Sequence, residues 1–459
     1  MSKILESLKS LSHQFNENEL TLWVAYSGGL DSHVLLHSLH TLKQQGIIHA
    51  RLAAIHIHHG LSTNADQWSL HCEKVCNSLD ISLLVKKVLC DAGTNVEESA
   101  RNARYAAFAD CLQSADILLT AHHLDDQAET LLLRLMRGAG TKGLQGIPKQ
   151  RRFKTSQIIR PLLGISRNEL CDYANQNKLE WIEDESNAVT DYDRNYIRHE
   201  IMPLLEKRWP GYRLNLARTA ALAGQAERLQ AELGRQDLEE VCLNNPAKLD
   251  ISRFETLSLD RQKNVLRCWF IELEQVMGIP VPDYNMINRV LKEVIQARQD
   301  AQPEVKLQAD SGWCFIRRYG NVLHVLQEHE PLLPQEPLIW IKGKALELPD
   351  PLGRLSLIQA DSFGIKLDAL NCVTVCFRQG GEQVRIHGRK MRPLKKVLQD
   401  LKVPTWERQF VPLVYGDDEL LAVGDYFLCE HQAVKKWSNE DNRLYRIDWQ
   451  RKDSGEPGL

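Results

Sequence analysis

The stretch LWVAYSGGLDSHVLLHSL, residues 22–39, decides the fold of the first part of this chain. An apolar run at 22–26 precedes the polar hexapeptide SGGLDS at 27–32, and a run with helical spacing follows it, so we predict a strand-to-helix turn. Two adjacent glycines let backbone N–H groups close on an anion, and the positive end of the following helix attracts it further. The hexapeptide therefore predicts a phosphate-binding loop.

The hexapeptide is not the phosphate loop of kinases and GTPases, because it lacks the G-x-x-x-x-G spacing and the lysine that follows it. It resembles the SGGxDS pyrophosphate loop of enzymes that split ATP between its α and β phosphates, leaving AMP and pyrophosphate. The serine hydroxyls would then donate to phosphate, and the Asp31 carboxylate would hold Mg²⁺. A polar turn without a ligand is the alternative. The ATP-binding candidates are Ser27, Gly28, Gly29, Leu30, Asp31 and Ser32.

Short apolar runs alternate with helical patterns from about residue 20 to 180. This rhythm predicts an α/β fold, with a parallel five-stranded sheet covered by helices on both faces. Ligands of such sheets bind beyond the carboxyl ends of the strands, where the hexapeptide lies. The predicted strands are 22–26, 52–58, 83–88, 117–121 and 158–163, and the predicted helices are 32–45, 64–79, 95–114 and 125–137.

A group of carboxylates follows the fourth predicted strand, in the run HHLDDQAET. Asp125, Asp126 and Glu129 lie three and four residues apart, so they share the first turn of a helix beside the carboxyl edge of the sheet. They could bind Mg²⁺ or a cationic substrate, or accept a proton from an amine. Simple capping of the helix is the alternative. The catalytic candidates are Asp31, Asp125, Asp126 and Glu129.

Arginines near two predicted helix starts could contact phosphates of ATP or RNA. Arg101 and Arg104 share one helical face, although ion pairs with Glu97 and Glu98 would also explain them. The other candidates for substrate contact in this part of the chain are His122, at a strand end, and Arg194, in a basic helix start after the run WIEDESN.

The net charge of the whole chain is only −3, but charge is segregated along it. Residues 378–408 contain nine Lys or Arg against three Asp or Glu. This excess predicts contact with nucleic acid phosphates, and a solvated basic face is the alternative. The candidates there are Arg385, Arg389, Lys390, Arg392, Lys395 and Lys396.

Length and composition are those of an ordinary globular protein, with 459 residues of which 43% are hydrophobic and 25% charged. We expect domains at 1–215, 216–330 and 338–459, with a proline-containing linker at 328–337. No apolar run approaches the roughly 20 residues that span a bilayer, and the start lacks a secretory signal. We therefore predict a cytoplasmic protein without membrane contact. Eleven cysteines without a C-x-x-C pair predict buried, reduced thiols.

Seven motifs occur in the order seen in the bacterial tRNA(Ile)-lysidine synthetases, which this chain resembles over roughly residues 20–215 and again at 377–415. SGGLDS alone marks only the superfamily of PP-loop ATP pyrophosphatases, whereas HHLDDQAET together with the basic tail narrows it to this family. The middle region is the least diagnostic. The motifs are SGGLDS, IHIHHGLS, ARNARYAAF, HHLDDQAET, RPLLGISRNEL, WIEDESN and RNYIRHEIMPLL.

The resemblance implies an ATP-dependent ligase that joins free L-lysine to C2 of the wobble cytidine in the CAU-anticodon isoleucine tRNA. The C2 oxygen would first be adenylated with release of pyrophosphate, and the ε-amine of lysine would then expel AMP. The substrates would be ATP with Mg²⁺, lysine and tRNA. The first domain would be catalytic, while the helical arm with the middle domain and the basic C-terminal domain would bind tRNA. A homodimer is compatible with this reading.

Three alternatives stay open at the level of sequence. A tRNA thiolase on the same loop would need a reactive cysteine pair or an iron–sulfur cluster. A PP-loop synthetase acting on small molecules would have no use for the basic tail. A tRNA-binding protein with a decayed site would have no reason to keep both SGGLDS and HHLDDQAET.

Overall fold

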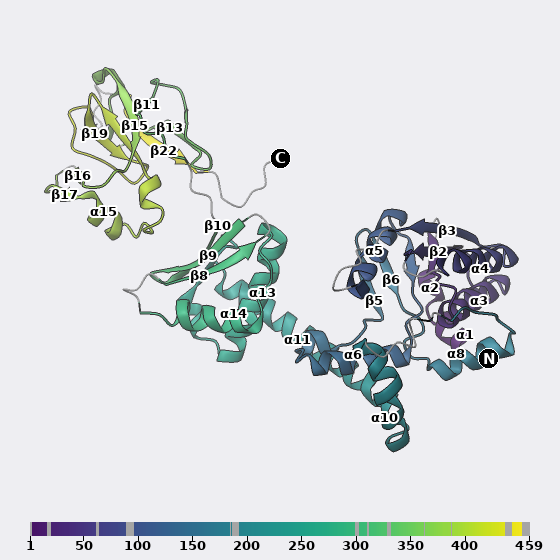
Figure 1. Cartoon of the computed structure of the whole chain (residues 1–459). Helices are drawn as coiled ribbons and strands as arrows, with labels where there is room; N and C mark the ends of the chain where they lie inside the picture. Colours follow the sequence, from purple (N-terminus) through teal and green to yellow (C-terminus); the bar gives the residue numbers. More distant parts are fainter. Residues whose placement is uncertain are drawn as a thin grey trace. The chain divides into compact units, whose positions relative to one another are not determined.

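The computed structural model describes residues 2–15, 20–60, 64–88, 96–183, 185, 192–298, 303–309, 312–327, 332–361, 363–386, 388–436 and 443–451. The chain divides into two compact units, Met1–Gln230 and Ala231–Leu459 (Figure 1). Parts of IHIHHGLS, of WIEDESN and of the predicted linker lie outside the described residues, as do the side chains of Glu97 and Glu98. No described helix is long and apolar enough to cross a membrane.

The first unit is built on a six-stranded sheet in the order β3-β2-β1-β4-β6-β5. Five strands run parallel, as predicted, and the sixth, β5, pairs antiparallel with β6 at the edge. The α/β fold class is therefore confirmed. The strands are β1 Thr21–Ala25, β2 Arg51–His58, β3 Ser82–Lys87, β4 Ile117–Leu119, β5 Gln150–Phe153 and β6 Ser156–Ile159.

Helices cover both faces of this sheet (Figure 1). One core joins the sheet to α1, α3, α4 and α8, and a second joins it to α5 through Ala107 and Phe108. A smaller core lies between α6 and the helices from 197 to 216. The helices are α1 Lys3–Lys9, α2 Ser12–Phe15, α3 Leu30–Gln44, α4 Ala65–Ser78, α5 Val96–Cys111, α6 Leu124–Met136, α7 Thr141–Leu144, α8 Arg167–Gln176, α9 Asp193–Tyr196, the π-helical η2 Ile197–Ile201, α10 Met202–Arg208 and α11 Tyr212–Val241, which belongs to the second unit from Ala231 onward.

Strand β5 is the element of this sheet that the sequence did not predict. Its residues, QRRF, are mostly polar, and it forms a tight hairpin with β6 in which Lys154 takes a left-handed φ of 52°. A strand at a sheet edge buries little, so apolar periodicity gives it no signal. The hairpin has a functional consequence, because it places Arg151 next to α5.

The second unit begins with an antiparallel sheet in the order β7-β10-β9-β8, packed against helices around Trp269 and Phe270 (Figure 1). Helix α13 ends at Gly278, which takes a left-handed φ of 65° that suits glycine. The elements are β7 Lys248–Asp250, α12 Ile251–Glu255, α13 Leu259–Met277, α14 Tyr284–Arg289, the π-helical η3 Val290–Ile295, β8 Glu304–Ala309, β9 Gly312–Tyr319 and β10 Val322–Gln327.

Two antiparallel five-stranded sheets follow, in the orders β11-β15-β18-β19-β20 and β12-β13-β22-β14-β21, with one shared core. The elements are β11 Leu338–Ile339, β12 Leu346–Glu347, β13 Arg354–Gln359, β14 Phe363–Ile365, the 3₁₀ helix η4 Leu367–Ala369, β15 Val373–Phe377, β16 Gln383–Val384, β17 Arg392–Pro393, α15 Leu394–Asp400, the 3₁₀ helix η5 Arg408–Phe410, β18 Pro412–Gly416, β19 Glu419–Val423, β20 Phe427–Leu428, β21 Val434–Lys436 and β22 Tyr445–Gln450.

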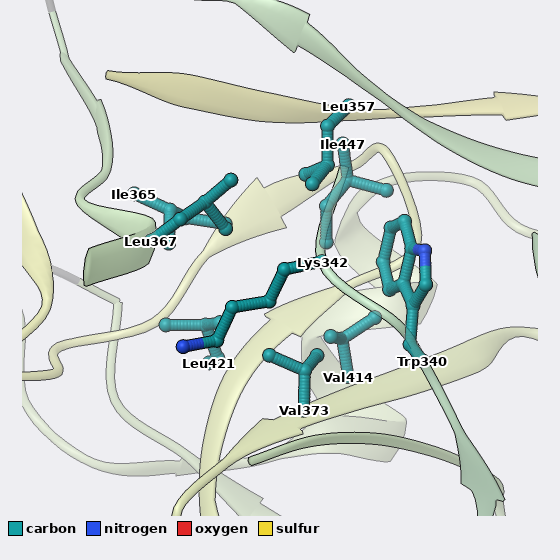
Figure 2. Close-up of a pocket in the computed structure, with 9 residues that line it drawn as sticks. All are labelled: Trp340, Lys342, Leu357, Ile365, Leu367, Val373, Val414, Leu421 and Ile447. Atoms are coloured by element: carbon teal, nitrogen blue, oxygen red, sulfur yellow. The ribbon is translucent and has the colours of Figure 1, made fainter. Parts of the chain in front are cut away.

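A small apolar cavity of about 10 Å³ lies in this core, lined among others by Trp340, Ile365 and Ile447. Figure 2 shows the side chain of Lys342 crossing the gap, and its ammonium group donates to the backbone carbonyl of Leu370. A void of this size holds at most one water molecule. The cavity is therefore a packing feature and not a substrate site.

Candidate active site at the carboxyl edge of the first sheet

The glycine loop follows β1 and leads directly into α3, as predicted. Gly28 takes a left-handed φ of 84°, and a Cβ there would lie 3.1 Å from both the Cys72 sulfur and the Ile182 side chain. The Ile182 N–H also donates to the Gly28 carbonyl at 3.0 Å. The close approach of both neighbours explains why this position requires glycine.

The two serines of the loop hold its shape. The Ser32 hydroxyl accepts from the Ser27 N–H at 3.2 Å and donates to the Gly29 carbonyl at 3.0 Å. Gly29 is the N-cap of α3 and offers no side-chain cap to the first turn of the helix. The N–H groups of that turn therefore remain available to an anion, which the positive end of the helix also attracts.

Asp31 faces His123, the N-cap residue of α6. The Asp31 Oδ2 lies 3.5 Å from the His123 Nε2, and the Asp126 Oδ2 lies at the same distance from that nitrogen. The Asp125 N–H donates to the His123 Nδ1 at 3.2 Å, which places the proton of the neutral ring on Nε2, toward the two carboxylates. Burial lowers the pKa of His123, but Asp126 and Asp31 outweigh burial and raise it above its usual value.

The other carboxylate oxygen of Asp31, Oδ1, is buried and has no hydrogen-bond partner among the described residues. An unpaired carboxylate oxygen beside a phosphate loop fits a Mg²⁺ ligand, because Mg²⁺ is usually held by one or two carboxylates together with substrate phosphates. No three His, Cys, Asp or Glu side chains of the described part of the chain come together as a metal site. A bound Mg²⁺ would thus depend on Asp31 and on phosphate.

We call Asp125, Asp126 and Glu129 the acidic cluster. The structure places them together on α6 at the carboxyl edge, and arginines engage each of them. Arg213 donates to Asp125 at 2.5 Å, and Arg194 donates to Asp126 at 2.7 Å. Burial raises the pKa of Asp126, but His123 and Arg194 outweigh it and lower that pKa to about 2. Asp126 is therefore ionised at neutral pH.

Glu129 is the most enclosed member of the cluster, with 1% of its surface exposed. One oxygen accepts from Arg198 at 2.7 Å, and the other accepts from Arg194 at 2.7 Å and from Arg198 at 2.9 Å. A carboxylate so fully paired is a poor proton acceptor and has little room for a cationic substrate. The geometry favours a role in positioning the two arginines.

The remaining predicted residues of this unit lie near the same edge. The His122 imidazole is hydrogen-bonded to the Thr120 hydroxyl at 2.9 Å. Burial and nearby arginines lower the pKa of His122 to about 3, so the ring is neutral at neutral pH. Arg104 is near enough to His122 to contribute to that shift, whereas Arg101 lies over the ring of Tyr105 at 5.2 Å from its centroid.

The basic segment, residues 378–408, belongs to the second unit. Arg385 pairs with Glu430 at 2.8 Å and Arg392 pairs with Asp400 at 2.7 Å, so these two charges are partly neutralised. Arg389 and Lys390 are exposed on a loop, and Lys395 and Lys396 are exposed on α15. Among the described residues these four form no ion pair with a carboxylate, which leaves them available to an anionic partner.

Three arginines that hold the acidic cluster were only partly anticipated. The sequence predicts contact with RNA for Arg194, whereas it predicts no role for Arg198 or Arg213. Arg194 and Arg198 are four residues apart in RNYIR, so helical spacing could have paired them with the three- and four-residue spacing of the carboxylates. Arg213 is distant in sequence, and no local pattern predicts its contact with Asp125.

Comparison with known proteins decides the family. A PP-loop domain model matches residues 2–205, a TilS substrate binding domain model matches 249–324, and a TilS substrate C-terminal domain model matches 373–449. The tRNA(Ile)-lysidine synthase of Coxiella burnetii is 38% identical over 94% of each chain. This chain belongs to the tRNA(Ile)-lysidine synthase family. The tRNA(Ile)-lysidine synthase of Serratia proteamaculans is 39% identical over 94% of this chain and 96% of its own.

The family recognised from the sequence motifs is thereby confirmed, together with ATP use by the PP-loop domain. A solved structure of the U34-tRNA thiolase NcsA from Methanococcus maripaludis matches 50% of this chain and 78% of its own, with 19% identity and a TM-score of 0.40. The cysteines do not support a thiolase. Burial raises the pKa of the Cys72 and Cys76 thiols to about 12, so both are protonated at neutral pH.

Proposed function

We propose that the unit Met1–Gln230 carries both chemical steps of lysidine formation, with ATP on the glycine loop and the wobble cytidine and free L-lysine beside the acidic cluster. The family assigns the overall activity: ATP-dependent formation of lysidine at the wobble cytidine of tRNA(Ile). The observation that supports the placement most is that Asp31, on the phosphate loop, and Asp126, on α6, both face His123. The loop and the acidic cluster thus form one site.

In the first step the C2 oxygen of cytosine attacks the α-phosphorus of ATP and pyrophosphate leaves. The open N–H groups at the start of α3 and the hydroxyls of Ser27 and Ser32 would bind the departing pyrophosphate. Mg²⁺, when bound, neutralises charge on that leaving group, and the unpaired Asp31 Oδ1 is the atom that would hold it. His123, whose Nε2 lies 3.5 Å from the Asp31 Oδ2, would hold the Asp31 side chain in place.

In the second step the ε-amine of lysine attacks C2, and AMP departs with the former C2 oxygen. A lysine amine is protonated at neutral pH, so the site must first attract the ammonium group, and a proton must then pass from it to water before the amine attacks. Asp126 is ionised and would attract the ammonium group. Its low pKa makes it a weak base, so we assign it to orientation, and we assign Glu129 to positioning Arg194 and Arg198.

The rest of the chain would bind tRNA. In the middle region Lys306 lies 4.3 Å from the ring centroid of the partly exposed Trp313, an arrangement that suits stacking on a nucleotide. In the C-terminal region Arg389, Lys390, Lys395 and Lys396 are exposed and would contact phosphates. The domain boundaries at 1–215, 216–330 and 338–459 and the cytoplasmic location stay predictions. A homodimer also stays a prediction, which a light-scattering mass near 52.5 kDa would contradict.

The proposal is tested with purified protein, ATP, Mg²⁺, radiolabelled L-lysine and a CAU-anticodon isoleucine tRNA transcript. We expect label in the RNA and release of one AMP for each lysine incorporated. Release of AMP without lysine in the RNA would keep the adenylation step and reject lysine as the nucleophile. A transcript with a GAU anticodon is the control and should stay unlabelled.

A further inference from the structure

A second charged cluster lies near the acidic cluster and does not enter the proposed mechanism. Its centre is Tyr105 on α5. Three arginines surround this residue: Arg101 from the same helix, Arg151 from β5 and Arg160 just after β6. We call these four residues the Tyr105 cluster. The guanidinium carbons of Arg101 and Arg151 lie 5.2 and 4.8 Å from the Tyr105 ring centroid. Arg160 is within hydrogen-bonding reach of the Tyr105 hydroxyl.

Arg160 is deeply buried, with 2% of its surface exposed. One terminal nitrogen donates to the Pro148 carbonyl at 2.7 Å, but its Nε is buried without a hydrogen-bond partner among the described residues. The Nε of Arg151 is buried and unpartnered as well. The Arg160 side chain is buried and that of Arg151 is half-buried, and each has a buried Nε donor without a partner. Two such donors in the same place need an acceptor, because an unpaired buried donor is costly.

The charge of the cluster is also uncompensated. In the described part of the chain no carboxylate pairs with the exposed Arg101, the half-buried Arg151 or the buried Arg160. Burying an unpaired cation such as Arg160 is costly. Burial lowers the pKa of Arg160, and Arg151 and Arg101 lower it further. Three guanidinium groups around one aromatic ring therefore form a built binding site for an anion with several acceptor oxygens, such as a phosphate group.

The position of the cluster gives it access to the reaction. The N–H of Thr120, at the end of β4, donates to the Ile159 carbonyl, so Arg160 leaves the sheet beside His122 and the acidic cluster. The glycine loop follows β1, and β4 lies between β1 and β6. The ends of β1 and β6 are two strand spacings apart, which is roughly 10 Å. The Tyr105 cluster and the glycine loop therefore cannot hold the same phosphate.

We propose that Arg101, Arg151, Arg160 and Tyr105 form a second phosphate-binding site, separate from the glycine loop, that receives a phosphate of a substrate. Two substrates carry such a group: the phosphodiester backbone of the tRNA next to the wobble cytidine, and the α-phosphate of ATP. The assignment of these substrates rests on the proposed function. The anion-binding site itself rests on the unpartnered Nε atoms of the buried Arg160 and the half-buried Arg151, with Arg101 beside them.

The first test is Arg151→Gln, because Arg151 is on an edge strand where the fold tolerates change. Arg152→Gln is its matched control, since Arg152 is the next residue of β5 and is exposed. Binding of a fluorescent CAU anticodon stem-loop is measured against salt, and binding of ATP is measured separately by calorimetry. We expect Arg151→Gln to weaken RNA binding roughly fivefold and to reduce the salt slope by about 1, with no change for Arg152→Gln.

The two arms separate the sources of the phosphate. Weaker RNA binding with unchanged ATP binding assigns the site to the tRNA backbone, and the reverse result assigns it to the nucleotide. Unchanged binding of both overturns the proposal. If Arg151→Gln fails to fold, Tyr105→Phe replaces it in the test, because this change keeps the ring and removes only the hydroxyl. We expect Tyr105→Phe to weaken RNA binding roughly twofold. These assays need no turnover, so a wild-type protein that binds RNA through Arg151 but makes no lysidine would reject the proposed function alone.

Discussion

The acidic cluster on α6 and the Tyr105 cluster lie at the same edge of one sheet, yet their charges are satisfied in different ways. Each carboxylate of the acidic cluster accepts from at least one arginine, so the charge of that cluster is largely compensated within the protein. No described carboxylate pairs with the arginines around Tyr105, and two of their nitrogens are unpartnered. A charge already paired organises the site, whereas a charge left unpaired and buried indicates a bound partner.

The largest expected effect concerns Asp31, the carboxylate that combines a paired and an unpaired oxygen. Asp31→Ala should lower the rate of AMP formation by roughly 10³-fold or more, because it removes the carboxylate that would hold the Mg²⁺ neutralising charge on pyrophosphate. AMP release is measured with saturating ATP and tRNA. Asp172→Ala, an exposed carboxylate on α8, is the control. Wild-type activity in Asp31→Ala would contradict the assignment of the loop.

A second substitution tests how much the pairing of the acidic cluster with arginines stabilises the protein. Glu129→Gln removes the charge that pairs Arg194 and Arg198 in a buried place, so the free energy of unfolding should fall by about 3 kcal/mol. Urea denaturation measures it, with Glu200→Gln, an exposed residue of η2, as the control. A stability change below about 0.5 kcal/mol, the range of ordinary surface substitutions, would show that this pairing contributes little.

A third test concerns the unpaired cations of the C-terminal region. Changing both Lys395 and Lys396 to Gln should weaken binding of full-length tRNA several-fold and reduce the salt slope by about 2, because each exposed lysine releases about one counterion. The matched control changes Lys435 and Lys436, two exposed lysines of β21, to Gln. Equal losses in both double variants would mean that binding depends on total charge and not on this segment.

The smallest expected effect concerns His122, which lies between the two clusters. Its pKa is lowered from 6.5 to about 3, so the folded protein resists protonation while the unfolded chain takes up a proton. Stability is therefore lost as pH falls from about 6.5 toward 3. Between pH 7 and 5 the His122→Gln variant should therefore lose about 1 kcal/mol less free energy of unfolding than the wild type, a figure that allows for the partial exposure of the ring. The exposed His199→Gln is the control, and an unchanged pH profile in His122→Gln would contradict the burial of a neutral ring.

The parallel core of the sheet was predictable because each of its five strands is a short apolar run followed by a helical pattern. The antiparallel β5 was not, because Arg151 and Arg152 interrupt any apolar alternation and only pairing with β6 makes that segment a strand. The glycine loop was predictable for the same local reason, since its strand, turn and helix are contiguous in sequence.

The partners of the site residues were less predictable than the residues themselves. Asp125, Asp126 and Glu129 share a helix turn, which the spacing gives directly, but Arg213 reaches Asp125 from 88 positions along the chain. Arg160 was read only as part of a family motif, because nothing local reveals that it is buried beside Tyr105. Such contacts follow from how helices and strands pack and not from sequence spacing.

The central claim is that the glycine loop and the acidic cluster form one site that adenylates the tRNA. The most direct measurement is a single-turnover reaction with [α-³²P]ATP and the CAU isoleucine transcript in the absence of lysine. The account predicts label in the RNA for the wild-type protein, loss of that label when lysine is added, and no label with Asp31→Ala. Label transferred from [γ-³²P]ATP, or release of ADP instead of AMP, would contradict it.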